Sequence, residues 1–291
     1  MSELTKRTLF ALVAVPLALG VIYVGGAALA ALLSAMAALA AWELFRLGRA
    51  GGIDALDSVG IPLAAALPWL AWAELSGRLE LPLSFAAIAF LAILGAIIWA
   101  RGTEGRPLAA AAVTIFGVLY TGAMLSFGLQ LRYHPYADPA GVSPASGTTL
   151  VLLPLLLTWA SDTGAYFFGR LLGRRKLIPS VSPGKTVEGA IGGLLLSVVV
   201  CWAYVRWVLV PVGNLGLAPA GIVVFGILVS VAAQIGDLAE SLLKREAGVK
   251  DSSGIIPGHG GILDRFDSLL FVLPVAAMAF EWRLLLPVPG Q

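Results

Sequence analysis

Residues 217–240 read LAPAGIVVFGILVSVAAQIGDLAE, and residues 241–267 continue as SLLKREAGVKDSSGIIPGHGGILDRFD. The first stretch is apolar over the roughly 20 residues that a helix needs to cross a bilayer. The second stretch is rich in ionisable side chains and glycines, and a further apolar run follows it. A charged side chain at the centre of a membrane helix costs roughly 2.5–3.5 kcal/mol on insertion scales. Charges gathered between two spans therefore indicate a functional site.

The composition extends this membrane pattern to the whole chain of 291 residues. Hydrophobic residues make up 59% of the chain and charged residues 12%, against about 25% charged in soluble domains. We therefore predict an all-α, polytopic integral membrane protein with about nine transmembrane helices. The candidate spans are 8–24, 27–45, 59–75, 81–100, 107–131, 148–170, 186–209, 217–240 and 266–286. Lys6 and Arg7 make the first span resemble a signal peptide, but the spans that follow it favour a retained helix.

The basic residues predict the orientation of these helices. With the N-terminus in the cytoplasm, only Arg78, Arg132, Arg206 and Arg283 of the 19 lysines and arginines lie outside. This bias favours an N-in, C-out topology. The resulting cytoplasmic belt suits anionic lipid headgroups and nucleotide phosphates, and no nucleic-acid partner is expected. For Arg46, Arg49, Arg101 and Arg106, an ordinary topology signal explains the charge equally well.

The two halves of the chain differ in where they place acidic residues. Residues 1–145 are predicted to form lipid-facing scaffold helices, and residues 146–291 to carry a catalytic site on the cytoplasmic side. In the first half, Glu43 and Glu74 fall near helix ends and are expected to reach the interface. In the second half, acids recur at the cytoplasmic helix ends: Asp162, Glu188, Asp237, Glu240, Asp264 and Asp267. The single cysteine, Cys201, excludes an intramolecular disulfide. We expect His134 to be a solvated loop residue.

A pair of acids at the start of the last span predicts a metal site. Asp264 and Asp267 are three positions apart on one helix face, and two close carboxylates keep their charges when a cation lies between them. Ligands that offer only oxygen point to Mg²⁺. The alternative is that the acids favour the helix N-terminus, with Arg265 as a partner. Asp237 is our predicted third ligand, since Asp237, Glu240, Ser241 and Lys244 form one polar stripe, although a plain ion pair remains an alternative there.

Two loops are predicted to hold phosphate. In residues 254–261, Gly258, Gly260 and Gly261 permit positive φ and lead into a helix N-terminus, which favours an anion, although a flexible turn also explains them. Ser161-Asp162-Thr163-Gly164 precedes the loop 170–185, RLLGRRKLIPSVSPGK, which is strongly basic. Its end resembles a P-loop, but Pro179 stands where the first glycine belongs, and no strand is expected before it. Gly189 and Gly193 are explained by close helix packing.

At this point the sequence resembles the phosphatidate cytidylyltransferases, also called CDP-diacylglycerol synthases. The matching signature runs Ser241-x-Leu243-Lys244-Arg245, then Lys250-Asp251-x-Ser253, then Ile256-Pro257-x-His259-Gly260-Gly261-Ile262-x-Asp264-Arg265-Phe266-Asp267. The stretch from Ser161 to Gly193 is similar to the second recognisable block of that family, with Ser182-Pro183-Gly184-Lys185-Thr186 inside it. Residues 1–145 match the family only in being apolar spans.

The resemblance implies that CTP and phosphatidate react to give CDP-diacylglycerol and pyrophosphate. It implies catalytic roles for Asp237, Asp264, Asp267, Lys244 and Arg265, of which the three aspartates would hold Mg²⁺. The substrate-binding residues that it implies are Asp162, Ser182, Lys185, Arg245, Lys250, Asp251, His259, Gly260 and Gly261. Lys244, Arg245, Lys250 and Arg265 would hold the triphosphate, whereas Lys185 and the basic residues of 170–176 could instead receive the lipid headgroup. The family also implies a homodimer and a second, monovalent cation such as K⁺.

Other functions share parts of this pattern. An anion or nucleotide transporter also carries membrane charges, but transporters tend to have inverted repeats and broken helices at mid-membrane, and we find no repeat here. A second CTP-dependent lipid enzyme, such as an isoprenoid-ether cytidylyltransferase or a polyprenol kinase, differs mainly in its acceptor. The short loops favour a multi-pass protein of a bacterial plasma membrane with its active site facing the cytoplasm.

Overall fold

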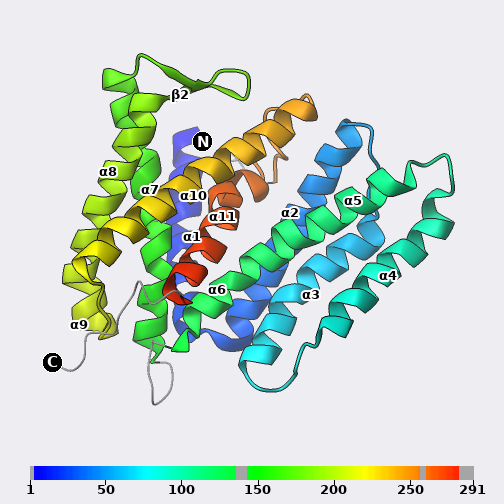
Figure 1. Ribbon diagram of the computed structural model, residues 1–291, viewed down its shortest axis with the longest axis horizontal. Helices are drawn as coiled ribbons and strands as arrows, with labels where there is room; N and C mark the ends of the chain where they lie inside the picture. The colour runs from blue at the N-terminus through cyan, green and yellow to red at the C-terminus, as the bar shows by residue number, and fades with distance from the viewer. Residues whose placement is uncertain (1–2, 136–142, 256–259, 282–291) are drawn as a thin grey trace. The chain divides into compact units, whose positions relative to one another are not determined.

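A computed structural model of the protein describes residues 3–135, 143–255 and 260–281, and most of them are helical (Figure 1). The helices are α1 (Glu3–Val24), α2 (Gly26–Ala50), α3 (Asp57–Leu75), α4 (Leu83–Arg101), α5 (Pro107–Gly117), α6 (Met124–Arg132), α7 (Pro144–Leu172), α8 (Val187–Tyr204), α9 (Val210–Gly213), α10 (Pro219–Glu246) and α11 (Leu263–Glu281). Two π-helical segments, η1 (Val118–Ala123) and η3 (Val205–Leu209), join α5 to α6 and α8 to α9. The prediction of a helical protein is therefore confirmed.

Seven of the described helical stretches are long and apolar enough to cross a membrane, as expected of a membrane protein. They are Gly26–Ala50, Asp57–Leu75, Leu83–Arg101, Pro107–Arg132, Pro144–Leu172, Val187–Gly213 and Pro219–Glu246, which correspond to the second to eighth predicted spans. The first predicted span has a shorter apolar helix, Leu12–Val24, as its described counterpart. The ninth corresponds to α11, which carries Asp264, Arg265 and Asp267 in its first turns. A total of nine spans and the N-in orientation stay predictions.

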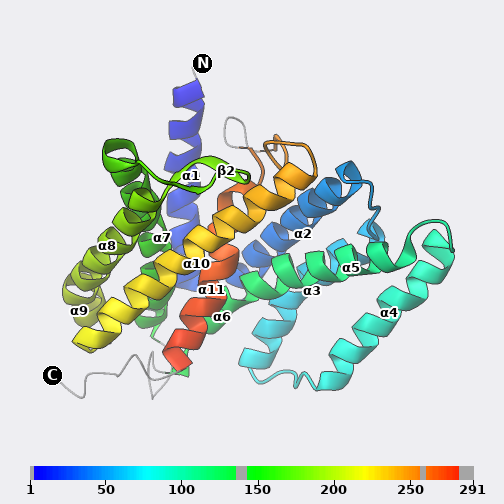
Figure 2. The same cartoon turned by 45° about the horizontal axis from the view of Figure 1, so that its top comes forward.

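One β-hairpin interrupts the helices, and the sequence did not predict it. Strands β1 (Lys176–Ile178) and β2 (Ser182–Thr186) pair antiparallel, with Lys176 opposite Thr186. The expectation that no strand precedes Gly-Lys-Thr was therefore wrong, because β1 does, although the tripeptide lies within β2 rather than in a phosphate-binding loop. Strand β2 runs directly into α8, where the Thr186 side chain accepts a hydrogen bond of 3.1 Å from the Gly189 amide and caps the helix. Figure 2 shows the hairpin at the adjoining ends of α7 and α8.

The chain forms two compact units, and the first contains residues 1–129 and 243–266. In it, α2 packs against α3, α5 and η1 around the fully buried ring of Phe45. Glycines admit this ring, because a Cβ at Gly60 or Gly117 would lie 2.6 or 2.2 Å from it. Small residues in membrane helices allow such close contact.

Several basic residues of the predicted cytoplasmic belt serve local structure in this unit. Arg49 forms an ion pair of 2.7 Å with Asp57, and Arg46 lies 4.9 Å over a tryptophan ring. Arg101 donates to two backbone carbonyls of the segment between α2 and α3, and Arg106 donates to a third. These contacts give the four arginines a structural role within this unit.

The second unit contains residues 130–242 and 267–291. Here α7 and α8 pack closely along glycines, since a Cβ at Gly164 or Gly189 would lie 2.8 or 2.7 Å from a backbone oxygen of the other helix. A Cβ at Gly193 would lie 2.8 Å from the Ser161 backbone oxygen of α7, so the packing role predicted for Gly189 and Gly193 is confirmed. His134 was wrongly expected to be solvated: it is 6% exposed and meets the Phe280 ring edge-on at 5.6 Å. Burial lowers the pKa of His134, and the charge of Glu281 opposes that shift.

The predicted boundary near residue 145 stays a prediction. The two units divide the chain differently, because residues 243–266 group with the N-terminal helices. The signature segment of the sequence therefore folds together with helices in which we expected only a scaffold.

Candidate functional site

The predicted site residues fall into two groups, one in each compact unit. The first unit holds Lys244, Arg245, Lys250, Asp251, Gly260, Gly261, Asp264 and Arg265, and the second holds Asp162, Ser182, Lys185, Asp237 and Asp267. His259 and Gly258 lie outside the described residues. Each group is described by itself below.

In the first unit, the Asp264 carboxylate is the centre of a dense hydrogen-bond network. Lys244 Nζ lies 2.8 Å from Oδ1 in an ion pair whose side chains are only 14% and 6% exposed, the lysine first. The amide and the hydroxyl of Ser252 donate to Oδ2 over 3.0 and 2.9 Å, and the Gly261 amide donates to it over 2.8 Å. A partly buried carboxylate with a lysine and three further donors is held in a single orientation.

The glycines of the loop make this network possible. Gly260 has φ of +80°, so the positive φ predicted for this run is confirmed there. A Cβ at Gly260 would lie 2.7 Å from Asp264 Oδ2. The Gly261 amide, predicted to face a phosphate, donates to Asp264 in this structure. The loop thus turns its backbone onto the aspartate.

Glu43 is a member of this site that the sequence analysis missed. We expected it to reach the membrane interface, and that was wrong, because it is 0% exposed. Its carboxylate accepts hydrogen bonds from the amides of Ile262 and Leu263 over 3.0 and 2.6 Å, and from the hydroxyls of Ser252 and Ser253.

These bonds explain how the start of α11 is held. The first amides of a helix have no partner within the helix. A carboxylate of α2 satisfies two donors at this end of α11, where negative charge is favoured. Gly261 leaves room for it, since a Cβ there would lie 2.4 Å from a Glu43 oxygen. The signal in the sequence was an acid within an alanine-rich span, which must find polar partners.

The other predicted residues of this unit face outward. Arg245, Lys250, Asp251 and Arg265 are exposed. The Arg245 guanidinium reaches the Val249 carbonyl at 3.5 Å. Their exposure leaves them accessible to a charged ligand.

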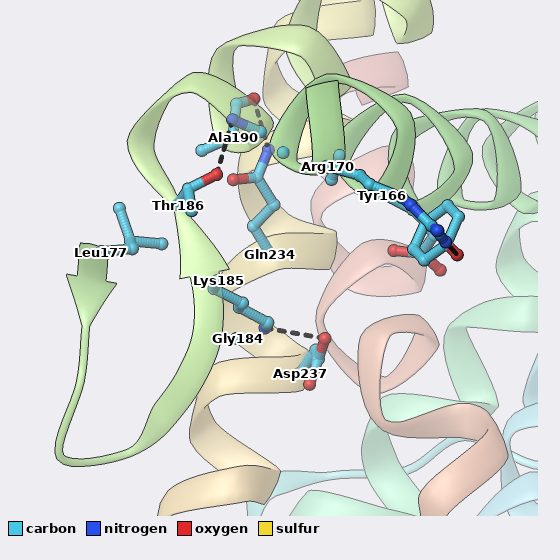
Figure 3. A pocket seen from close by; sticks show the side chains of 13 residues that line it. Tyr166, Arg170, Leu177, Gly184, Lys185, Thr186, Ala190, Gln234 and Asp237 are labelled. Atoms are coloured by element: carbon cyan, nitrogen blue, oxygen red, sulfur yellow. Dashed lines mark hydrogen bonds and ion pairs between the residues drawn. The ribbon is translucent and has the colours of Figure 1, made fainter. Parts of the chain in front are cut away.

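In the second unit, a pocket of about 540 Å³ gathers three of the predicted residues (Figure 3). Asp162 comes from α7, Lys185 from β2 and Asp237 from α10. Lys185 Nζ forms an ion pair of 2.7 Å with Asp237 Oδ2, and Ser241 Oγ donates to Asp237 Oδ1 over 3.3 Å. Ser182 lies on the same strand but does not line the pocket. The hairpin therefore brings the basic loop onto the acids of neighbouring helices.

Three further polar residues of the pocket lining form hydrogen bonds within this unit. Arg170, on α7, donates to the Tyr166 hydroxyl over 2.9 Å. Gln234, on α10, donates from Nε2 to the Ala190 carbonyl of α8 over 3.2 Å. Arg170 belonged to the predicted basic cluster, but Tyr166 and Gln234 were not singled out, because uncharged residues in apolar helices resemble packing residues.

The predicted metal ligands do not form a ready metal site among the described residues. No group of three or more His, Cys, Asp or Glu side chains in residues 3–135, 143–255 and 260–281 is placed to hold a metal ion. Asp237 is engaged by Lys185, and Asp264 by Lys244. Asp267 Oδ1 accepts from the Ser268 amide over 2.6 Å. The described arrangement is thus one of aspartate–lysine pairs.

Comparison with known proteins points in one direction. The sequence model of the cytidylyltransferase family matches residues 5–282. The chain is 48% identical over 131 residues to a phosphatidate cytidylyltransferase of Staphylococcus saprophyticus, covering 45% of this chain and 48% of that protein. It is 44% identical over 149 residues to one of Haemophilus influenzae, covering 50% and 49%. It is 43% identical over 165 residues to a phosphatidate cytidylyltransferase of Staphylococcus haemolyticus, covering 57% of each chain. The matched region spans about half the length of these curated relatives.

Proposed function

This chain belongs to the cytidylyltransferase family, and from this premise we propose that it transfers a cytidylyl group from CTP to phosphatidate. A phosphate oxygen of phosphatidate attacks the α-phosphorus of CTP, and the bond from that phosphorus to the β-phosphate oxygen breaks. The products are CDP-diacylglycerol, which phospholipid synthesis uses, and pyrophosphate, which is the leaving group. Phosphatidate is already ionised near pH 7, so the reaction needs no general base.

The observation that carries this proposal is the pocket of the second unit. It combines two cations, Arg170 and Lys185, with two acids, Asp162 and Asp237, on a framework of helices. Joining two phosphate anions requires that their charges be neutralised and their reacting atoms aligned. The pocket suits one of the two phosphate-bearing substrates.

The first unit offers further cations for the phosphates. We propose that Lys244, Arg245, Lys250 and Arg265 hold the triphosphate and the leaving pyrophosphate, with Asp251, His259, Gly260 and Gly261 beside them. Support comes from the exposure of the outer cations and from the position of Lys244 beside Asp264. Release of Asp264 to a metal ion would free the Lys244 ammonium for the triphosphate.

We propose Mg²⁺ as the cofactor, with Asp237, Asp264 and Asp267 as its ligands and a monovalent cation such as K⁺ beside it. The support is chemical, because carboxylate oxygens suit Mg²⁺ and two of the acids share a helix face. The described residues hold no preformed group of ligands, and the lysines that engage Asp237 and Asp264 would have to release them. When bound, Mg²⁺ would neutralise charge on the triphosphate.

Pyrophosphate release tests the proposed function. We would measure it for the purified protein in mixed micelles with phosphatidate, CTP and Mg²⁺, omitting each component in turn. Release that needs all three and stops with EDTA is the expected result. Pyrophosphate release without phosphatidate would contradict the proposed function, and so would the absence of release from folded protein. Release in the presence of EDTA would contradict the proposed role of Mg²⁺. The family resemblance also leads us to propose a homodimer, which light scattering of the detergent-solubilised protein would check.

The orientation of the protein is a separate proposal with its own test. We propose that the hairpin and the 241–265 segment face the cytoplasm, since the basic residues gather there. Cys201 is buried, so new cysteines can be labelled selectively. Ser180→Cys, in the hairpin turn, should react with a membrane-impermeant maleimide only after cells are opened, whereas Ser76→Cys, after α3, should react in intact cells. Labelling of Ser180→Cys in intact cells, with Ser76→Cys labelled only after cells are opened, would show the opposite orientation.

Replacing Lys244 by alanine is expected to raise KM for CTP by about 10-fold or more, because a charge-assisted contact to the triphosphate is lost. Lys244→Arg keeps the charge and should retain most of the affinity. Arg78→Ala, in the loop after α3, is the control and should leave KM unchanged. Initial rates at varied CTP and saturating phosphatidate measure the effect, and an unchanged KM in Lys244→Ala would remove Lys244 from the nucleotide site.

A further inference from the structure

We propose that Gln234 reads the base of the nucleotide by accepting a hydrogen bond from the 4-amino group of cytosine. This inference rests on the proposed function and deepens it, because it assigns the pocket of the second unit to the nucleoside end of CTP rather than to the lipid headgroup.

The first step is the orientation of the Gln234 amide. Gln234 is half-buried on α10, three residues before Asp237, and it lines the pocket. Its Nε2 donates to the Ala190 carbonyl over 3.2 Å and to Ser230 Oγ over 3.1 Å. A backbone carbonyl can only accept, so it selects the nitrogen end of the amide. Oε1 is then the end that is left to serve as an acceptor, and in Figure 3 it points away from Ala190.

The second step is that the surrounding network resists a flip of this amide. Ser230 Oγ lies 2.7 Å from Ser161 Oγ, and both serines are fully buried between helices. Gly193 lies beside the amide, since a Cβ there would be in van der Waals contact with Gln234 Nε2 at 3.4 Å. A flip would place Oε1 against the Ala190 oxygen. The pocket therefore presents a fixed acceptor that needs no rearrangement on binding.

The third step is the shape of the surrounding wall. The lining of the pocket includes four small residues, Ala165, Gly169, Gly189 and Ala190, together with the larger Tyr166 and Leu177. With a volume of about 540 Å³, the pocket has room for a pyrimidine ring. Lys185 and Arg170 lie on the same pocket and supply positive charge for a phosphate attached to that ring's sugar.

The fourth step is the match to a donor. The 4-amino group of cytosine donates, whereas uracil has a carbonyl at that position, which would oppose Oε1. The ester headgroup of phosphatidate carries no N–H donor, so a fixed acceptor offers it little. A site built to bond a donor rejects an analogue that lacks it, because its own polar group then stays unpaired.

The test combines a protein variant with a substrate variant. Gln234→Met keeps the length of the side chain and removes the acceptor. The triphosphate of the 2-pyrimidinone riboside is CTP with hydrogen in place of the 4-amino group. Each change alone should lower kcat/KM by about 10- to 100-fold, and both together should lower it little further, since they remove the same bond. The preference of the wild type for CTP over UTP should shrink correspondingly in Gln234→Met.

The controls separate base reading from other roles. Gln130→Met, at a half-buried position of α6, makes the same change away from the pocket and should leave the CTP-to-UTP ratio unaltered. Equal losses with CTP and UTP in Gln234→Met would reduce Gln234 to a structural residue and overturn the inference. A changed KM for phosphatidate alone would assign the pocket to the lipid, and a changed CTP-to-dCTP ratio alone would assign Gln234 to the ribose.

Two further arms keep the inference testable. Should Gln234→Met fail to fold, the loss with the 2-pyrimidinone analogue is compared between the wild type and Gln234→Asn, which keeps the amide but draws it back by one methylene. The loss should shrink in Gln234→Asn, because the bond to the 4-amino group is already broken there, and a loss of equal size in both proteins would overturn the inference. Should the wild type release no pyrophosphate, the proposed function fails, and calorimetric binding of CTP and UTP still decides base reading. Tighter binding of CTP would support it, and equal affinities would not.

Discussion

Asp264→Asn is expected to abolish pyrophosphate release, with a fall in kcat of about 1,000-fold or more. The Asp264 carboxylate accepts from Lys244, from both donors of Ser252 and from the Gly261 amide. An asparagine has one acceptor oxygen, and its NH₂ group would face one of these donors. The charge that orients Lys244 is also lost, and so is a proposed ligand of Mg²⁺.

The control for this variant is Asp54→Asn, which alters an acid that is 59% exposed and pairs with Arg101 over 3.3 Å. It should retain activity. We expect Asp264→Asn to stay folded with a lowered apparent Tm in micelles, because its shape is unchanged but its NH₂ group meets a donor. Substantial turnover by folded Asp264→Asn would remove Asp264 from the catalytic machinery and the metal site together.

Glu43→Gln is expected to have the second largest effect, and on stability as well as on activity. The carboxylate satisfies two helix amides and two serine hydroxyls in a fully buried position. Glutamine can accept with one oxygen only, so at least one amide loses its partner and meets the glutamine NH₂ group. A buried polar group left unpaired costs about 1–3 kcal/mol, and we expect unfolding free energy to fall by about that amount or more.

The activity of Glu43→Gln should fall as well, because the 252–263 segment holds Asp264 in place. Glu74→Gln is the matched control, since Glu74 is exposed on α3 and should tolerate the change. Ser253→Ala removes a single donor and should have a smaller effect in the same direction. Thermal unfolding and hydrogen exchange of the amides of residues 260–266 measure the outcome. Unchanged exchange there in Glu43→Gln would show that Glu43 does not hold the start of α11.

Much of the candidate site was predictable because its chemistry lies in short segments. The lysine, glycines and aspartate of 244–264 are close in sequence, so one loop between two helices brings them together. The pairing of Lys185 with Asp237 was not predictable in this way. It depends on a hairpin whose strands are too short, and too rich in glycine and proline, to show the alternation of a strand.

The sequence by itself determined the class of protein and the residues that carry its chemistry. Long apolar runs can satisfy their backbone in lipid only as helices, and charges that survive beside such runs mark a site. Tertiary structure alone decided the partners of those charges. Glu43 contacts residues more than 200 positions away, and its burial follows from the packing of α2, which no local pattern encodes. The orientation of the Gln234 amide likewise depends on a carbonyl of another helix, because a hydrogen bond is set by distance in space and not by separation along the chain.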